Sequence, residues 1–281
     1  MIENDSYQWQ RGGACLGGAA VARQRCHLAS ALVRADPAPE LWAMASDGSF
    51  ERWMPEIAAL AMEQDPIHRH KDVLAHSIAV TARTKPELRI RLAALLHDVG
   101  KPSTRRYRGG AVTFHHHEAV GARLAARRLE MLGFDSDLVS DVTRLVELSG
   151  RFKGYEQGWT DAAVRRYARD AGHLLGDLNQ LVRCDCTTRR AATVERIGSL
   201  VDDLELRIAS LAVADRRAAV RPLLGGAQIM AALSIEPGPV VGEARRLLLS
   251  EQERRPALTA CEAKALLLEW WRQRPQGRAA P

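Results

Sequence analysis

The residues most able to do chemistry are the adjacent pair His97-Asp98, at the end of an apolar helical run. His76 falls on the apolar face of an earlier predicted helix, and Asp185 takes the next position on a later apolar stripe. Buried charges without partners cost several kcal/mol, so four such groups favour a common ion. Imidazole and carboxylate ligands together suit Mn, Fe, Co or Ni, with Mg as a further candidate.

A different explanation applies to each of these residues taken alone. A lone histidine on an apolar face is more often a hydrogen-bonded core residue, and an aspartate at a helix end is often a cap or an ion-pair partner. The combination of four such positions favours the ion. The sequence therefore predicts a divalent-metal site built from His76, His97, Asp98 and Asp185.

Helical periodicity runs through most of the chain, and glycines such as Gly100, Gly133 and Gly150 end the apolar runs. No segment shows sustained alternation with period two, so we predict an all-α protein. Helices are expected over about 19–34, 88–99, 118–132, 137–148, 160–172, 227–233 and 241–251.

One long predicted helix carries a heptad seam of apolar residues, namely Val194, Ile197, Val201, Leu204, Ile208 and Leu211. Such a seam could join two copies of the chain in a homodimer. A seam this short more often packs inside its own domain, and that interpretation is the stronger of the two.

Composition limits the class of protein. The five cysteines are an odd number at irregular spacing with no secretory signal before them, so we expect no disulfide framework. No run approaches the roughly 18 apolar residues of a membrane helix, which predicts a soluble cytoplasmic protein with no membrane contact. A net charge of +6 permits phosphate-rich partners but is far from that of a dedicated nucleic-acid binder.

Six stretches of the chain resemble a known family. They read HKDVLAHS, LAALLHDVGKPSTRR, FHHHEAVGARLAARRL, WTDAAVRRYARDAG, LVRCDCTTR and QIMAALSIEPGPVVGEARRLL. Together with the order His76, His97-Asp98, Asp185, they resemble the HD superfamily of metal-dependent phosphohydrolases, an all-α fold. The nearest resemblance is to the HD-containing C-terminal half of actinobacterial-type CCA-adding tRNA nucleotidyltransferases, over about residues 66–271.

This resemblance implies a domain organisation. We expect an N-terminal segment over 1–45, an HD metal-binding domain over 46–192, a C-terminal helical region over 193–272 similar to the body and tail of those enzymes, and a loose tail over 273–281. Residues 1–65 contain neither the D-x-D pair nor the glycine-rich loop of a nucleotidyltransferase head. We therefore expect no CCA addition by this chain alone.

The resemblance also implies roles for individual residues. His76, His97, Asp98 and Asp185 would bind the metal, Asp98 would orient the attacking water, and Lys101 would face the substrate phosphate. Substrate contacts are implied for His70, Arg105, Arg106, His115 and His116, although solvated surface charge or a polar loop explains these five equally well. His117 matches the histidine of a second metal site. Ser149 stands near where related sequences often carry a further histidine, so a complete second site is not expected.

The activity implied is metal-dependent hydrolysis of a nucleotide or nucleotide-like substrate, either a phosphomonoester or a 2′,3′-cyclic phosphodiester, by an activated water. The alternative is a tRNA-binding module of a split or degenerate tRNA nucleotidyltransferase. A third interpretation, a decayed HD scaffold without activity, conflicts with the intact set His76, His97, Asp98 and Asp185.

Overall fold

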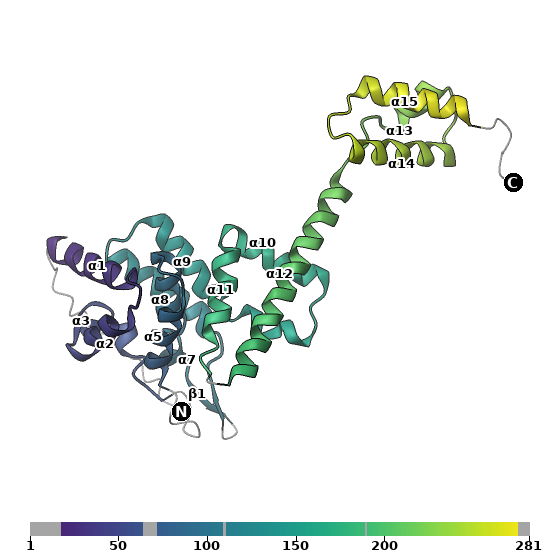
Figure 1. Cartoon of the computed structure of the whole chain (residues 1–281). Helices are drawn as coiled ribbons and strands as arrows, with labels where there is room; N and C mark the ends of the chain where they lie inside the picture. Colours follow the sequence, from purple (N-terminus) through teal and green to yellow (C-terminus); the bar gives the residue numbers. More distant parts are fainter. Residues whose placement is uncertain (1–17, 64–71, 109–110, 189, 275–281) are drawn as a thin grey trace, which may run out of the picture. The chain divides into compact units, whose positions relative to one another are not determined.

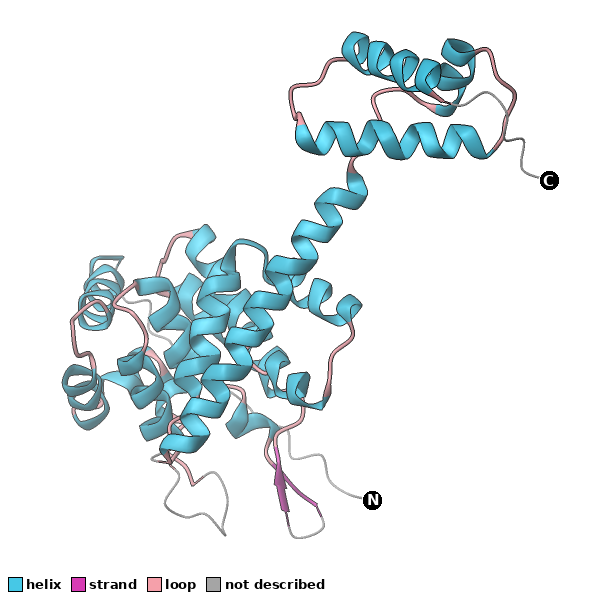
Figure 2. Ribbon diagram, turned by 45° about the vertical axis from the view of Figure 1, so that its right-hand side comes forward, coloured by secondary structure: helices cyan, strands magenta, loops and turns pink. Residues whose placement is uncertain are grey.

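The structure is a computed structural model, and it describes residues 18–63, 72–108, 111–188 and 190–274 (Figures 1 and 2). The chain forms two compact units, Met1–Ile208 and Ala209–Pro281. The long helix α12 (Ala191–Ala219) contains the boundary between them. The domain ranges given above stay a prediction, and residues 275–281 of the predicted tail lie outside the described residues.

The first unit is built almost entirely from helices. Its elements before α12 are α1 (Gly18–Leu32), α2 (Ala38–Ser46), α3 (Ser49–Trp53), α4 (Pro55–Ala58), α5 (Val73–Arg83), α6 (Leu88–Leu96), α7 (Lys101–Thr104), β1 (Arg106–Arg108), β2 (Ala111–Thr113), α8 (His117–Met131), α9 (Ser136–Leu148), η1 (Arg151–Gln157), α10 (Asp161–Ala171), η2 (Gly172–Leu174) and α11 (Leu175–Asp185). The predicted all-α fold class is confirmed.

One short hairpin accompanies the helices of the first unit. Strands β1 and β2 pair as an antiparallel hairpin, with Tyr107 opposite Val112. Each strand has three residues, which is too short for an alternating pattern to be recognised in the sequence.

Helix α6 lies at the centre of the first unit. Every residue from Ile90 to Leu96 is buried, so the helix is covered on all sides rather than along one stripe. It packs against α1, α5, α9 and α11. The chain leaves this helix at His97, which therefore begins its turn inside the protein.

An ionic network holds α11 against its neighbours. The buried carboxylate of Asp177, in the first turn of α11, accepts hydrogen bonds from Arg89 Nε at 2.8 Å and lies 3.0 Å from Lys85 Nζ. Arg89 also reaches Asp141 on α9, at 3.2 Å. Hydrogen bonds from Lys85 to Asp177 and Glu87 raise the pKa of the lysine. Because a buried carboxylate must be paired, this network fixes one end of the helix whose other end is Asp185.

The centre of the predicted seam on α12 packs within its own chain. Val201 and Leu204 are fully buried, whereas Val194 at one end of the seam is 43% exposed. The homodimer stays a prediction. Across the described residues, the search for a helix long and apolar enough to cross a membrane gives no candidate.

The second unit continues with α13 (Gly226–Leu233), α14 (Pro239–Arg254) and α15 (Ala260–Gln273). Ile229, Ala244, Leu248, Ala263 and Leu267 are its fully buried core residues. Thr259 and Glu262 form a capping box at the start of α15.

Candidate metal centre

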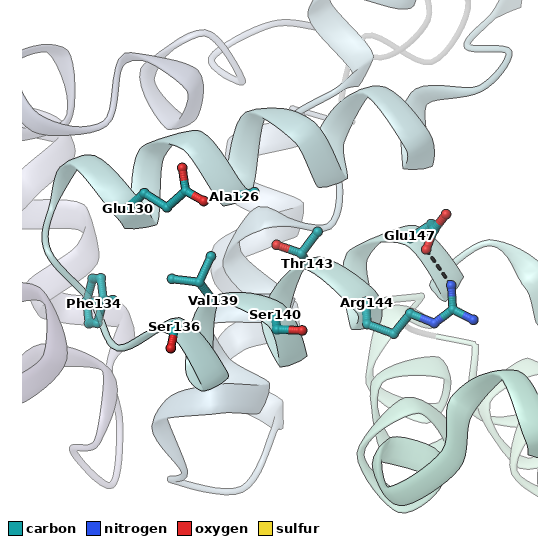
Figure 3. Close-up of a pocket in the computed structure, with 9 residues that line it drawn as sticks. All are labelled: Ala126, Glu130, Phe134, Ser136, Val139, Ser140, Thr143, Arg144 and Glu147. Atoms are coloured by element: carbon teal, nitrogen blue, oxygen red, sulfur yellow. Dashed lines mark hydrogen bonds and ion pairs between the residues drawn. The ribbon is translucent and has the colours of Figure 1, made fainter.

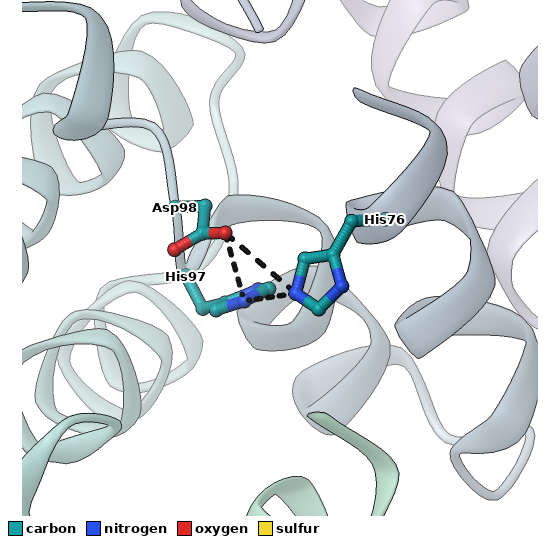
Figure 4. A group of neighbouring side chains, drawn as sticks. All are labelled: His76, His97 and Asp98. Carbon is teal, nitrogen blue, oxygen red and sulfur yellow. Dashed lines mark hydrogen bonds and ion pairs between the residues drawn. The ribbon is translucent and has the colours of Figure 1, made fainter. Parts of the chain in front are cut away.

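Three helices bring the predicted ligands together. His76 projects from α5, His97 and Asp98 follow α6, and Asp185 is the last residue of α11. His76, His97 and Asp98 form a group that could hold a metal ion, and Figure 4 shows their side chains turned toward one another. Asp185 Oδ1 lies 2.9 Å from His76 Nε2 and 3.4 Å from His97 Nε2, so a second carboxylate stands beside this group of three. We call these four residues the metal cluster.

The donor spacing of the metal cluster fits a divalent ion. His76 Nε2 and His97 Nε2 are 3.3 Å apart, and Asp98 Oδ2 is 3.3 Å from His97 Nε2 and 3.7 Å from His76 Nε2. Metal–ligand bonds of about 2.1 Å place neighbouring donor atoms roughly 3 Å apart. Two imidazoles and two carboxylates are also a donor set that Mn, Fe, Co and Ni accept.

The other nitrogen of each imidazole fixes the direction of the ring. His97 Nδ1 donates to the carbonyl oxygen of Ala94 at 2.7 Å, and because a carbonyl only accepts, this nitrogen carries the proton. His76 Nδ1 lies 3.0 Å from the hydroxyl of Thr187. Both Nε2 atoms are thereby directed into the cluster. A second partner of this kind is what metal-binding histidines use to hold their orientation.

Burial and mutual attraction act in opposite directions on the pKa values here. His97 and Asp98 are 4% and 2% exposed. Burial alone would lower the pKa of His97, but Asp98 and Asp185 outweigh it and raise that pKa to about 10. Burial would likewise raise the pKa of Asp98, yet His97 and Lys101 hold it well below its usual range. Burial would also raise the pKa of Asp185, but hydrogen bonds from His76 and His97 keep that pKa well below its usual range.

Lys101 and His117 approach Asp98 from different sides. Lys101 Nζ lies 2.7 Å from Asp98 Oδ2, and His117 Nε2 lies 3.7 Å from Asp98 Oδ1. His117 Nδ1 donates to the carbonyl oxygen of Phe114 at 2.8 Å. Burial lowers the pKa of His117, although the bond to Phe114 opposes this, which favours the neutral ring with a bare Nε2. The structure thus places His117 beside the cluster, as a second-metal position requires.

A close approach of two backbones brings His117 to this place. A Cβ atom on Gly100 would lie 2.0 Å from the carbonyl oxygen of His117 and 2.7 Å from the nitrogen of Gly121. Helix α8 can therefore cross the turn after Asp98 only if residue 100 has no side chain. Glycine here does more than end the preceding helix.

A cavity of about 190 Å³ opens over the cluster. The four cluster residues line it together with Lys101, His117, Ser149, Gly150 and Lys153. Lys153 is the functional candidate that the sequence analysis missed. It stands in the short 3-10 helix η1, where neither periodicity nor a motif marks it, and only the packing of that segment brings it to the cavity.

Four further predicted residues that the structure describes, His115, His116, Arg105 and Arg106, do not line the cavity over the cluster. His115 and His116 line an adjoining cavity of about 340 Å³, which shares Lys101, His117 and Lys153 with the first. Arg105 stacks over the ring of Tyr107 at 5.2 Å, and Arg106 is exposed on β1. His70 lies outside the described residues.

A separate cavity of about 550 Å³ lies between α8 and α9 (Figure 3). Its polar lining includes Glu130, Thr143 and the ion pair between Arg144 and Glu147 at 2.6 Å. None of the predicted site residues lines it. Although this cavity is larger than the one over the cluster, it is therefore not the candidate metal centre.

A family model for the HD domain matches residues 73–218, a stretch that contains the whole metal cluster. The chain belongs to the HD domain family. This family places it in a superfamily of metal-dependent hydrolases whose domains bind divalent metals. The resemblance predicted from the sequence is thus confirmed.

Two relatives are tRNA nucleotidyltransferases. The A-adding tRNA nucleotidyltransferase of Deinococcus radiodurans is 30% identical over 266 residues, which cover 90% of this chain and 59% of that protein. The CC-adding tRNA nucleotidyltransferase of Thermus thermophilus is 34% identical over 229 residues, which cover 78% of this chain and 49% of that protein. The chain therefore spans about half the length of the relatives that it matches.

The Gly100→Ala substitution tests the close approach between Gly100 and α8. Because the added Cβ overlaps backbone atoms, we expect the free energy of unfolding to fall by about 1–3 kcal/mol. Gly176→Ala is the matched control, since α11 leaves its Cβ open space and the change is expected to stabilise by at most about 1 kcal/mol. Urea denaturation measures both variants. Equal stability of the two variants would contradict the close approach of α8 to Gly100.

Metal affinity is expected to rise with pH. With the pKa of His97 near 10, the metal-free imidazole is protonated at neutral pH and must lose that proton to bind an ion. One released proton per ion makes the dissociation constant fall about tenfold for each pH unit. Calorimetric titration with Mn²⁺ between about pH 6 and 8 measures this slope.

Two variants control this titration. His97→Ala removes a ligand and should bind Mn²⁺ far more weakly, whereas His173→Ala changes a histidine whose side chain is 71% exposed and should titrate like the parent chain. Tight binding that is independent of pH, or full retention of binding in His97→Ala, would show that the ion is held elsewhere.

Proposed function

We propose that this chain is a metal-dependent phosphohydrolase acting on a nucleotide or nucleotide-like phosphomonoester or 2′,3′-cyclic phosphodiester. The observation that carries the proposal is the group formed by His76, His97 and Asp98 within an HD domain, with Asp185 in contact with His76 at 2.9 Å. The nucleotide class is supported by the relatives, which are named as enzymes that add nucleotides to tRNA.

The cluster would hold one divalent ion, for which Mn, Fe, Co, Ni and Mg are candidates. Such an ion lowers the pKa of a water and polarises a phosphoryl oxygen, which supplies a nucleophile near neutral pH. Asp98 remains ionised, and its Oδ1, which lies 3.7 Å from His117 Nε2, can orient the attacking water. The bare Nε2 of His117 faces the same oxygen and can accept a hydrogen bond from that water.

Lys101 supplies positive charge to the substrate. Its ammonium lies beside Asp98 and lines the cavity over the cluster, so a phosphate entering there meets a fixed cation. Positive charge placed where the phosphate develops negative charge lowers the barrier to hydrolysis.

The test is hydrolysis of nucleoside 2′-, 3′- and 5′-monophosphates and 2′,3′-cyclic phosphates by the metal-loaded chain. Lys101→Met should lower kcat by about 10²–10³-fold while the bound metal, measured by elemental analysis, is retained. Lys264→Met, which changes an exposed lysine on α15, is the control and should leave kcat unchanged. The absence of hydrolysis from the whole panel, or an unchanged kcat in Lys101→Met, would refute the proposal.

We infer a second candidate function, binding of tRNA, from how much of this chain the relatives match. The match to the A-adding enzyme covers 90% of this chain and so extends well beyond the HD domain. Helix α14 in the second unit carries exposed Arg245, Arg246 and Arg254. Arginine side chains of this kind suit contacts to a phosphate backbone.

Salt dependence tests the tRNA candidate. Phosphate contacts release counterions, so the logarithm of the association constant should fall linearly with the logarithm of the salt concentration. Arg245→Gln with Arg246→Gln should reduce that slope by about 1–2, whereas Arg123→Gln with Arg127→Gln, on the exposed face of α8, should not. Fluorescence anisotropy with labelled tRNA gives the slope. No binding at low salt would exclude this candidate.

A further inference from the structure

A further cavity, of about 270 Å³, adjoins the metal cluster at Asp185. It shares Ser149, Lys153 and Asp185 with the cavity over the cluster, so the two cavities adjoin at these residues. The cavity extends away from the cluster between η1, α11 and α12.

The walls of this further cavity, which we call the apolar cavity, are mainly apolar by area. Phe152, Val182, Ile197 and Leu200 supply them, and Phe152 and Val182 are almost fully buried. One of the polar groups at its edge already has a partner, since Glu156 forms an ion pair with Arg196. A ligand here would be held by contact with its flat or apolar surface more than by hydrogen bonds to its edges.

Lys153 stands where the cavities meet. It lines the cavity over the cluster, the apolar cavity and the cavity lined by His115 and His116. Its side chain is 67% exposed, and its Nζ lies 3.6 Å from Glu118 Oε1. A long cationic side chain at this junction can contact a phosphate bound at the cluster while the rest of the ligand extends into the apolar cavity.

We propose that the apolar cavity binds the heterocyclic base of a nucleotide whose phosphate lies at the metal cluster, with Lys153 contacting the phosphate at the junction. This assignment rests on the proposed function, because the cluster defines where the phosphate lies. A nucleotide combines a phosphate with a flat, weakly polar ring, and the two adjoining cavities offer a region with Lys101 and Lys153 and an apolar region side by side. Because contacts with the ring surface dominate, purine and pyrimidine nucleotides should bind with similar affinity.

Saturation-transfer NMR with adenosine tests the base cavity without requiring hydrolysis. The full chain should transfer saturation to the adenine H2 and H8 protons more strongly than to the ribose protons. Leu200→Trp and Ile197→Trp fill the cavity from two positions on α12 and should remove most of the transfer to adenine. Leu206→Trp is the matched control on the same helix, because Leu206 is 72% exposed, and it should behave like the parent chain.

The same variants are then compared on AMP and on ribose 5-phosphate, which lacks the base. Loss of the buried ring contact should raise KM for AMP at least about tenfold in Leu200→Trp and leave KM for ribose 5-phosphate within about twofold. Equal saturation of base and ribose protons in the parent chain, or identical behaviour of the Leu200→Trp, Ile197→Trp and Leu206→Trp variants, would overturn the inference. Adenine saturation that disappears in Leu200→Trp supports the base cavity even if no phosphoester is hydrolysed, and that result would refute only the proposed function.

Discussion

The buried carboxylate of Asp98 is the constraint on which the rest of the site depends. An ionised carboxylate that is only 2% exposed must be compensated, because removing one partner of a buried charge costs about 3–5 kcal/mol. His76 comes from α5, His97 from the end of α6, Lys101 from α7 and His117 from α8. The need to surround one charge thus fixes the relative placement of four helices, and the chemistry of the site follows from that placement.

Two structural features make this arrangement possible. The backbone at Gly100 lets α8 approach closely enough to present His117, and a side chain there would overlap the backbone of α8. At the far side, the ion pairs of Asp177 secure one end of α11, so that Asp185 at the other end meets the histidines. The same helix therefore carries a structural carboxylate and a proposed metal ligand with different partners. Asp185 lines the cavity over the cluster.

The surroundings of the cluster divide by polarity. Lys101, His117 and the histidines before α8 make one side cationic or polar, whereas Phe152, Val182, Ile197 and Leu200 make the other side apolar. Lys153 belongs to both sides. This division is what a ligand with a phosphate at one end and a ring at the other requires, and it is consistent with relatives named for adding nucleotides to tRNA.

The sequence by itself determined the helical class of the protein and predicted His76, His97, Asp98 and Asp185 as candidate metal ligands, because polar residues on apolar helical stripes are a local pattern that needs no knowledge of packing. It also indicated the HD family through its motifs. The tertiary structure alone decided that Lys153 lines the cavity over the cluster, that Arg105 instead stacks on Tyr107, and that a hairpin interrupts the helices. Those positions depend on how short segments without periodicity pack against helices distant in the sequence. Contacts of that kind leave no repeating pattern in the chain.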